Sequence, residues 1–285
     1  MTNTLRAACW MVGAIASFSA MAIAARIVLD DLSAMQLMFY RNIIAVAVLL
    51  LCLPLIGLQR LKVQQPLTHL IRHSVHFLGQ YAWFVAIALI PLAQVFALEF
   101  TVPIWAVLFA ALLVNEPITR QRLWAVVLGF AGTLVIVRPG LVAVETGTVV
   151  MLAGALAFGL VHTLTRKITL TDNPMSVMVL MNFLQLPMAG IAFGFDPVWP
   201  PTWQWPCLIA IALAALSAHY CLARALSLAP ANVVIPMDFL RLPLIAVLAW
   251  WIFQEPLELW LFVGAGLMLA GIWINLRPEQ NLKAR

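Results

Sequence analysis

The chain contains a stretch of sixty residues that occurs twice. Residues 80–139 recur as residues 219–278 at a constant offset of 139 positions, without insertion or deletion. A constant offset over this length indicates two related halves, which we place at residues 1–140 and 141–285. The matching positions are Tyr81 and Tyr220, Pro91 and Pro230, Glu99 and Asp238, Phe100 and Phe239, Glu116-Pro117 and Glu255-Pro256, Gly132 and Gly271, Arg138-Pro139 and Arg277-Pro278, and, at an offset of 141, Arg26 and Lys167 and Asp31 and Asp172.

The composition excludes a soluble protein. Of the 285 residues, 64% are hydrophobic and 9% are charged, whereas soluble domains carry about 25% charged residues. The four cysteines lie in apolar runs without paired spacing, so neither a disulfide framework nor a zinc site is indicated. The net charge of +5 comes from basic residues in short loops beside apolar runs, which favours membrane orientation over nucleic-acid binding.

Apolar runs long enough to cross a bilayer number ten, five in each half. The first resembles a signal peptide, but its counterpart recurs in mid-chain, so we expect a retained helix. Because five is odd, two copies of one fold must enter the membrane in opposite directions. We therefore predict an all-α integral membrane protein with ten transmembrane helices, built from two inverted five-helix repeats. The spans are 7–25, 33–56, 70–90, 92–114, 122–138, 147–165, 174–195, 206–226, 231–253 and 259–276.

The basic residues predict the orientation. With the N-terminus inside, twelve arginines and lysines are cytoplasmic and two, Arg26 and Arg138, face outside. This bias predicts a multi-pass protein of the cell inner membrane with both termini in the cytoplasm. The cytoplasmic set is Arg6, Arg60, Lys62, Arg72, Arg120, Arg122, Arg166, Lys167, Arg224, Arg277, Lys283 and Arg285.

Four charged residues lie deep within the predicted spans. Arg41 and Glu99 are each about 11 Å below the outer end of a span, so they could pair. Asp238 and Arg241 are three residues apart and can pair on one helix face. A charge at the bilayer centre is costly, so such pairs either lock helices together or line a solvated pathway. The sequence leaves both readings open.

The third span carries a polar stripe. His69, His73, His76 and Gln80 share one helix face that runs from the cytoplasmic end towards the midplane, and it should face the interior. The spacing of His69 and His73 also fits a metal site, but no acidic or cysteine ligand lies nearby on that helix, and we expect no metal. His219 and Tyr220 hold the positions of Gln80 and Tyr81 in the second half. The two tyrosines could pack in the core or contact substrate.

Other motifs read as structural. Glu116-Pro117 and Glu255-Pro256 suit helix ends, where the proline begins the next helix and the acid favours its positive end. Glycines in the fifth and tenth spans allow close helix approach, as a packing or dimer face. No phosphate-binding loop is present, which excludes an ATP-driven pump, and no cofactor is expected. The glycines are Gly129, Gly132, Gly264, Gly266 and Gly271.

Several short motifs together resemble the drug/metabolite transporter superfamily of the ten-helix EamA type, over nearly the whole chain. The resemblance implies a basket of helices around a central cavity, with the fifth and tenth helices peripheral, and secondary transport, commonly the export of amino acids and related metabolites. Arg41 has no counterpart in the second half, where Asn182 stands. The motifs are Phe39-Tyr40-Arg41, Pro91-Leu92-Ala93, Phe100, Pro103, Asn115-Glu116-Pro117, Gly129, Gly132, Arg138-Pro139-Gly140, Arg224-Ala225, Leu228-Ala229-Pro230-Ala231, Glu255-Pro256 and Gly271.

We expect a secondary transporter that exports a small polar or zwitterionic metabolite such as an amino acid, with protons as a candidate coupling ion. The alternative is uptake of a larger aromatic or nucleoside-like metabolite, for which Trp83 and Trp105 offer stacking surfaces. A membrane-embedded enzyme is a third reading, without a nucleophile or metal cluster to support it. Partners are the substrate and the lipid bilayer, with no nucleic acid, and the protein is a monomer or homodimer. Candidate cavity residues are Arg41, His76, Gln80, Tyr81, Glu99, Trp105, His219, Tyr220, Asp238 and Arg241.

The orientation can be tested with single cysteines and a membrane-impermeant thiol reagent. In intact cells, cysteines at Asp31, Glu145 and Gln204 should be labelled, because those positions are predicted to face outside. Cysteines at Lys62, Gln121 and Leu282 should stay unlabelled until the membrane is permeabilised. Labelling of the second group in intact cells would overturn the orientation.

Overall fold

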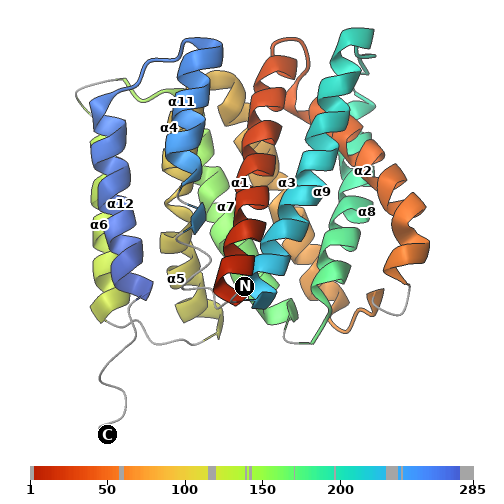
Figure 1. The fold of residues 1–285 in the computed structure, drawn as a ribbon, viewed down its shortest axis with the longest axis horizontal. Coiled ribbons are helices and arrows are strands. Elements are labelled where there is room, and N and C mark those ends of the chain that lie inside the picture. Colours follow the sequence, from red (N-terminus) through yellow and green to blue (C-terminus); the bar gives the residue numbers. More distant parts are fainter. Residues whose placement is uncertain are drawn as a thin grey trace, which may run out of the picture.

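The computed structural model describes residues 3–57, 61–114, 120–138, 140, 143–169, 171–195, 197–228, 237–238 and 240–276. These residues form helices and short connections, without a β-strand (Figure 1). In chain order the elements are α1 (Asn3–Val28), α2 (Ala34–Ile56), α3 (Pro66–Leu89), α4 (Leu92–Glu99), α5 (Val102–Val114), α6 (Arg120–Val137), α7 (Thr146–Thr169), α8 (Pro174–Phe193), the short 3₁₀ helix η2 (Thr202–Gln204), α9 (Trp205–Leu228), α11 (Arg241–Phe253) and α12 (Leu259–Leu276).

The helix bounds repeat the offset seen in the sequence. α9, α11 and α12 begin and end 139 residues after α3, α5 and α6, and α7 ends 141 residues after α1. The second helix of each half begins at a side-chain cap, Ser33 for α2 and Asn173 for α8. Such caps satisfy backbone N–H groups that the first turn leaves unpaired. Each half therefore builds the same helices at the same register.

Six helical segments among the described residues are long and apolar enough to cross a bilayer by length and composition. Three shorter apolar helices add to them. We count α3 as a further span, because the residues of its polar stripe are buried inside the protein. Taking α4 with α5 as one span, and α11 as the described part of the ninth, gives five spans in each half. The six segments are Leu5–Val28, Ala34–Pro54, Leu92–Leu113, Thr146–Thr165, Met175–Phe193 and Thr202–Leu222, and the shorter ones are Val126–Val137, Arg241–Phe253 and Leu259–Ile274.

The fourth span is not the continuous helix that its apolar run predicts. α4 ends at Glu99 and α5 begins at Val102, because Pro103 suits the first turn of a helix but cannot continue one. The Thr101 hydroxyl donates to the carbonyl of Leu98 at 2.8 Å, which satisfies one backbone group at the break. The second half begins α11 at Arg241, the equivalent position. Residues 229–236, in the predicted ninth span, lie outside the described residues.

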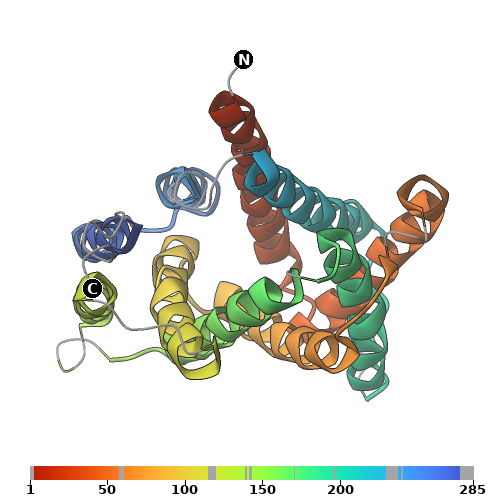
Figure 2. The ribbon, with the colours of Figure 1, turned by 90° about the horizontal axis from the view of Figure 1, so that it is seen from below.

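The helices pack mainly across the two halves, as Figures 1 and 2 show. α1 packs along α9, and the equivalent α7 packs along α3. The first loop of each half binds the segment that leads into the third helix of the other, since Gln204 donates to Asp31 at 2.8 Å and the Gln64 N–H donates to Asp172 at 3.0 Å. Gln204 is therefore fully buried, so the outer labelling position moves to Trp203, which is 53% exposed.

α6 and α12 form a pair at the edge of the molecule (Figure 2). A Cβ atom on Gly132 would lie 2.5 Å from the Gly264 carbonyl oxygen, closer than real Cβ contacts allow. Glycine at these positions therefore lets the two backbones touch. The peripheral place expected for the fifth and tenth helices is confirmed.

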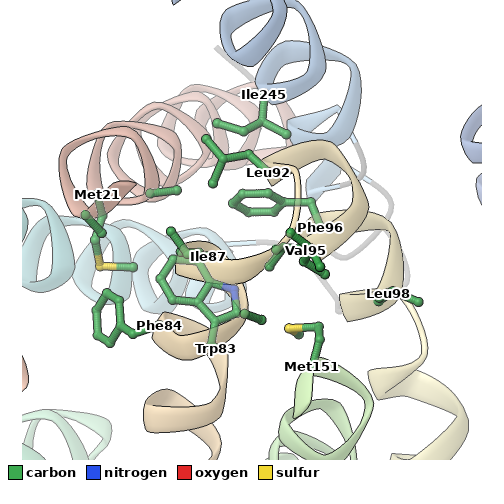
Figure 3. Close-up of a cluster of buried hydrophobic side chains, with 14 of the residues drawn as sticks. Met21, Trp83, Phe84, Ile87, Leu92, Val95, Phe96, Leu98, Met151 and Ile245 are labelled. Atoms are coloured by element: carbon green, nitrogen blue, oxygen red, sulfur yellow. The ribbon is translucent and has the colours of Figure 1, made fainter. Parts of the chain in front are cut away.

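Large apolar side chains pack together around the end of α3 and the start of α4 and fill the interior there (Figure 3). This cluster combines side chains from α1, α3, α4, α7 and α11, and most of its members are fully buried. In the predicted orientation it lies in the outer half. The labelled members are Met21, Trp83, Phe84, Ile87, Leu92, Val95, Phe96, Leu98, Met151 and Ile245.

Candidate functional site

Two carboxylates share one arginine at the break in the fourth span. Arg241 Nη2 lies 3.0 Å from Glu99 Oε1 and 3.2 Å from Asp238 Oδ2. The indole N–H of Trp83 donates to the other oxygen of Glu99 at 3.2 Å. The pairing predicted between Asp238 and Arg241 is confirmed.

One expectation about these charges is wrong. Arg41 does not pair with Glu99, whose partner is Arg241. Glu99 shares that guanidinium nitrogen with Asp238. Equal depth in a span fixes the height of a side chain but not the direction in which its helix face points.

Each charge of the central pair stands at the unfavourable end of its own helix. Glu99 is the last residue of α4, beside the negative end of the helix dipole. Arg241 is the first residue of α11, beside the positive end. Both placements oppose the usual preference. The ion pair offsets this local cost, and such local conflicts concentrate at functional sites.

The cluster has unused hydrogen-bonding capacity. The Asp238 side chain is 30% exposed and the Glu99 side chain 19%. Asp238 Oδ1 and Arg241 Nε are buried atoms without a hydrogen-bond partner among the described residues. The guanidinium lies 5.0 Å from the ring centre of Phe18 and 4.8 Å from that of Phe96. A ligand here would meet both charge and aromatic surface.

Aromatic and imidazole rings extend the site across the interior. Phe18 lies edge-on to the ring of His219, with centroids 5.6 Å apart, and His219 lies 6.2 Å from His76. Gln185 of α8 then contacts His76 Nδ1 at 2.9 Å. The series Glu99, Arg241, Phe18, His219, His76 and Gln185, which we call the central series, joins α4, α11, α1, α9, α3 and α8.

Arg41 and Gln80 carry unpaired polar atoms in the same interior. Arg41 is fully buried and donates to Asn42 at 2.8 Å, while its Nε and Nη1 have no partner in the described part of the chain. Its charge acts on the rings of both His76 and His219. Gln80 is buried, and its side-chain oxygen is likewise unpartnered. Buried charge without a partner is costly, so an anionic group of a solute would be stabilised there.

Three candidate residues lie apart from the central series. Tyr81 and Tyr220 are 39% and 42% exposed, and Tyr220 packs edge-on against Trp10 of α1. Trp105 of α5 abuts α7, where a Cβ on Gly159 would lie 2.4 Å from its own Cβ. These three positions fit helix packing. Phe18 and Gln185 are additions that the sequence did not single out, although a lone glutamine in an apolar span is a usable signal.

A clasp at the end that the sequence predicts to face outside joins α1, α3, α4 and the α11–α12 connection. Arg26 donates to the carbonyls of Ile87 and Ile90 and lies 3.5 Å from Glu255 Oε1. Glu255 Oε2 accepts the backbone N–H of Leu92, at the start of α4, at 2.7 Å. The acid thus caps α4, whereas the Glu-Pro motif predicted a cap on the following helix, and α12 begins only at Leu259. Glu116-Pro117, the matching motif, lies outside the described residues.

A separate pocket of about 110 Å³ lies beside the clasp but contains no residue of the central series. It includes the ion pair between Arg138 and Glu258 at the surface. Within the described ranges, no group of three or more His, Cys, Asp or Glu side chains could hold a metal ion. We therefore place the candidate binding site on the central series.

Comparison with known proteins decides the family. The model of the EamA-like transporter family matches residues 5–138 and again 145–277. The chain belongs to this family. It is 30% identical over 230 residues to a riboflavin transporter of Rhizobium johnstonii, covering 79% of this chain and 75% of that protein. It is 22% identical to an S-adenosylmethionine uptake transporter of Rickettsia prowazekii, covering 88% and 85%.

Two further matches fit the same family. A pseudopaline exporter of Pseudomonas aeruginosa is 26% identical and is covered over 79% of each chain. A crystal structure matches the fold with a TM-score of 0.65 at 17% identity, over 94% of this chain and 96% of that one. The protein is thus a multi-pass small-molecule transporter, with ten transmembrane helices in two inverted repeats, and it groups with transporters rather than enzymes.

Because Glu99 and Asp238 share one arginine, the effect of Glu99→Gln on stability should change sign when Arg241 is replaced. Arg241→Gln should destabilise the protein by about 3–5 kcal/mol, because it leaves two carboxylates close together without a cation. Glu99→Gln should destabilise the wild type but stabilise Arg241→Gln, where it removes repulsion. Thermal unfolding in detergent measures both effects.

A double-mutant cycle on the surface pair of Arg138 and Glu258 is the control. Because the Glu258 side chain is 56% exposed, that pair should couple by about 1 kcal/mol or less. The changes in stability from Arg41→Gln and Glu99→Gln should add in the double variant, because these two residues do not pair. If Glu99→Gln destabilises equally with and without Arg241, the shared arginine is not what holds the carboxylates.

Proposed function

We propose that this transporter carries an organic metabolite that joins a flat aromatic ring system to a polar or charged tail, of the riboflavin or nucleoside class. The observation that carries the proposal is the central series, in which two charged groups, a phenyl ring, two imidazoles and an amide follow one another across six helices. The ring of Phe18 lies between Arg241 and His219, so aromatic and charged surfaces meet at one place. Relatives named as riboflavin and S-adenosylmethionine transporters support this class of substrate.

Each residue of the site would bind the part of the substrate that its chemistry suits. Rings of Phe18 and His219 offer faces for stacking a planar heterocycle. His76 and Gln185 offer donors and acceptors for its polar edge. Asp238, which is partly exposed and has a free oxygen, would take an amine, sulfonium or hydroxyl group of the tail.

A second candidate is export of a small zwitterionic metabolite, amino acids or their derivatives first. Its support is the balance of interior charge, in which Arg41 and Arg241 face Glu99 and Asp238. A carboxylate would go to Arg41 and an amine to Asp238. The relative named as a pseudopaline exporter supports the outward direction within this family.

Counterflow in proteoliposomes separates the two candidates. Vesicles loaded with unlabelled solute receive labelled riboflavin, S-adenosylmethionine or alanine. The first proposal expects exchange of riboflavin or S-adenosylmethionine, reduced at least about tenfold by His219→Ala, the loss of roughly 1.4 kcal/mol of binding, and unchanged in the exposed control Tyr81→Phe. Exchange of alanine alone would favour the second candidate, and exchange of none of the three would reject both.

Alternating access requires that the outer end open at some stage. The clasp of Arg26, Glu255 and Leu92, together with the apolar cluster of Figure 3, holds that end shut in this structure. We therefore assign the clasp to the outer gate and expect it to break in the outward-open state.

A buried reporter cysteine tests the outer gate. Glu255→Ala removes the cap on α4 and the partner of Arg26, and loss of such a cap costs about 1 kcal/mol. An impermeant reagent should then label a cysteine at Ile87, which is fully buried, about fivefold faster or more than in the parent. Glu258→Ala breaks only the surface pair with Arg138, so its labelling rate should match the parent. Equal rates in all three proteins would remove the clasp from gating.

A further inference from the structure

A second chain of ionisable side chains lies towards the start of α3, next to His76 and Gln185 of the central series. Asp172, in the α7–α8 connection, lies 2.9 Å from His69 Nε2. His69 Nδ1 lies 3.3 Å from His73 Nε2, and His73 Nδ1 lies 2.9 Å from Arg72 Nη1. All four residues are buried, with Arg72 the most exposed at 6%. We call these four residues the inner chain.

Arginine fixes where the protons of the inner chain lie. A guanidinium group can only donate hydrogen bonds, so His73 Nδ1 must accept from Arg72. A neutral His73 then carries its proton on Nε2 and donates it to His69 Nδ1. His69 in turn carries its proton on Nε2 and donates to Asp172. Every hydrogen bond runs in one direction, from the cation to the carboxylate, through two neutral imidazoles.

This arrangement has no place for one more proton. An imidazolium donates from both ring nitrogens. A proton added to His69 would set two N–H groups against each other unless His73 shifted its own proton to Nδ1. That shift would point an N–H at the donors of Arg72. An added proton therefore breaks the inner chain at one of its links.

The inner chain ties α3 to its neighbours. Arg72 Nε donates to the Thr165 hydroxyl of α7 at 3.1 Å. Asp172 also accepts from the Gln64 N–H and from the Thr171 hydroxyl. Breaking the chain would therefore loosen the contact between α3 and the α7–α8 connection.

The carboxylate of Asp172 is held in its ionised form. Burial raises the pKa of Asp172, but hydrogen bonds from Gln64, Thr171 and His69 outweigh it and hold the pKa below its ordinary value. Other ionisable groups within electrostatic range of Arg72 are His76 on α3, His162 on α7 and His219 on α9. Arg41 on α2 is within range of His76 and His219. Lys167 on α7 is exposed, and its backbone carbonyl accepts a hydrogen bond from Gln65.

The repeat shows that the fold does not need this chain. At the offset of 139 residues, His69, Arg72 and His73 correspond to Leu208, Ile211 and Ala212. α9 forms with the same bounds as α3 and packs on α1 as α3 packs on α7. The polar chain is therefore an addition to one end of the molecule only.

We propose that the inner chain is a proton-binding switch, in which one added proton on the His69–His73 pair releases α3 from the α7–α8 connection. In the predicted orientation this end faces the cytoplasm, so the switch supplies a site for a coupling proton. That role rests on the proposed transport function. The switch itself can be tested without any substrate.

Histidine nitrogen NMR in lipid bilayers tests the proton positions. The protein has five histidines, few enough to assign by single replacement. At pH 7.5 His69 and His73 should both be Nε2–H tautomers, and on acidification they should change together. Arg72→Met removes the donor that imposes this order, so the pair should protonate about one pH unit higher or more. Lys167→Met removes the same charge outside the chain and should leave both tautomers unchanged.

Hydrogen exchange tests the release. After correction for intrinsic rates, the segments 64–72 and 165–175 should exchange faster on acidification from pH 7.5. His69→Leu/Arg72→Ile/His73→Ala installs the residues of the second half and should remove this pH dependence. If the triple variant does not fold, Arg72→Met gives the test, with faster exchange already at higher pH. A mixture of tautomers at pH 7.5, or a pH dependence that survives the triple replacement, would overturn the proposal.

Discussion

The guanidinium group of Arg241 is the contact on which the interior depends. It brings together the end of α4 in the first half and the start of α11 in the second. The helix dipole disfavours Glu99 at the end of α4 and Arg241 at the start of α11, and the ion pair between them offsets both costs. An apolar pair would hold these helices more cheaply, since buried ion pairs seldom stabilise more than a hydrophobic contact. Retaining charge here makes sense for a protein that must bind a polar solute.

The order of spans and the inverted repeat could be predicted from the sequence because length, hydropathy and register are one-dimensional properties. The helix bounds of α3 and α9 keep the offset read from Tyr81 and Tyr220, and the polar stripe of α3 is buried as its period requires. Partners across helices could not be predicted in this way. Glu99 finds Arg241, 142 residues away, and His69 finds Asp172, 103 residues away.

The break in the fourth span was missed because hydropathy does not sense backbone continuity. Residues 92–114 read as one apolar run, and only Pro103 signals that the helix restarts. Phe18 escaped notice for a related reason. A phenylalanine in an apolar span carries no mark of function until the structure places both Arg241 and His219 against its ring.

The packing of equivalent helices has a further consequence. α6 with α12 and α2 with α8 each join a helix to its own counterpart, so these pairs lie about the axis that relates the halves. By contrast, α1 with α9 and α7 with α3 are two distinct contacts that the same axis exchanges. If the inward-open and outward-open forms are mirror roles of the two halves, an on-axis helix pair such as α6 with α12 contributes equally to both. Off-axis contacts weight one form against the other. Substitutions that shift the balance between the inward-open and outward-open forms should therefore accumulate along α1, α3, α7 and α9. Helix pairs on the axis should carry few of them.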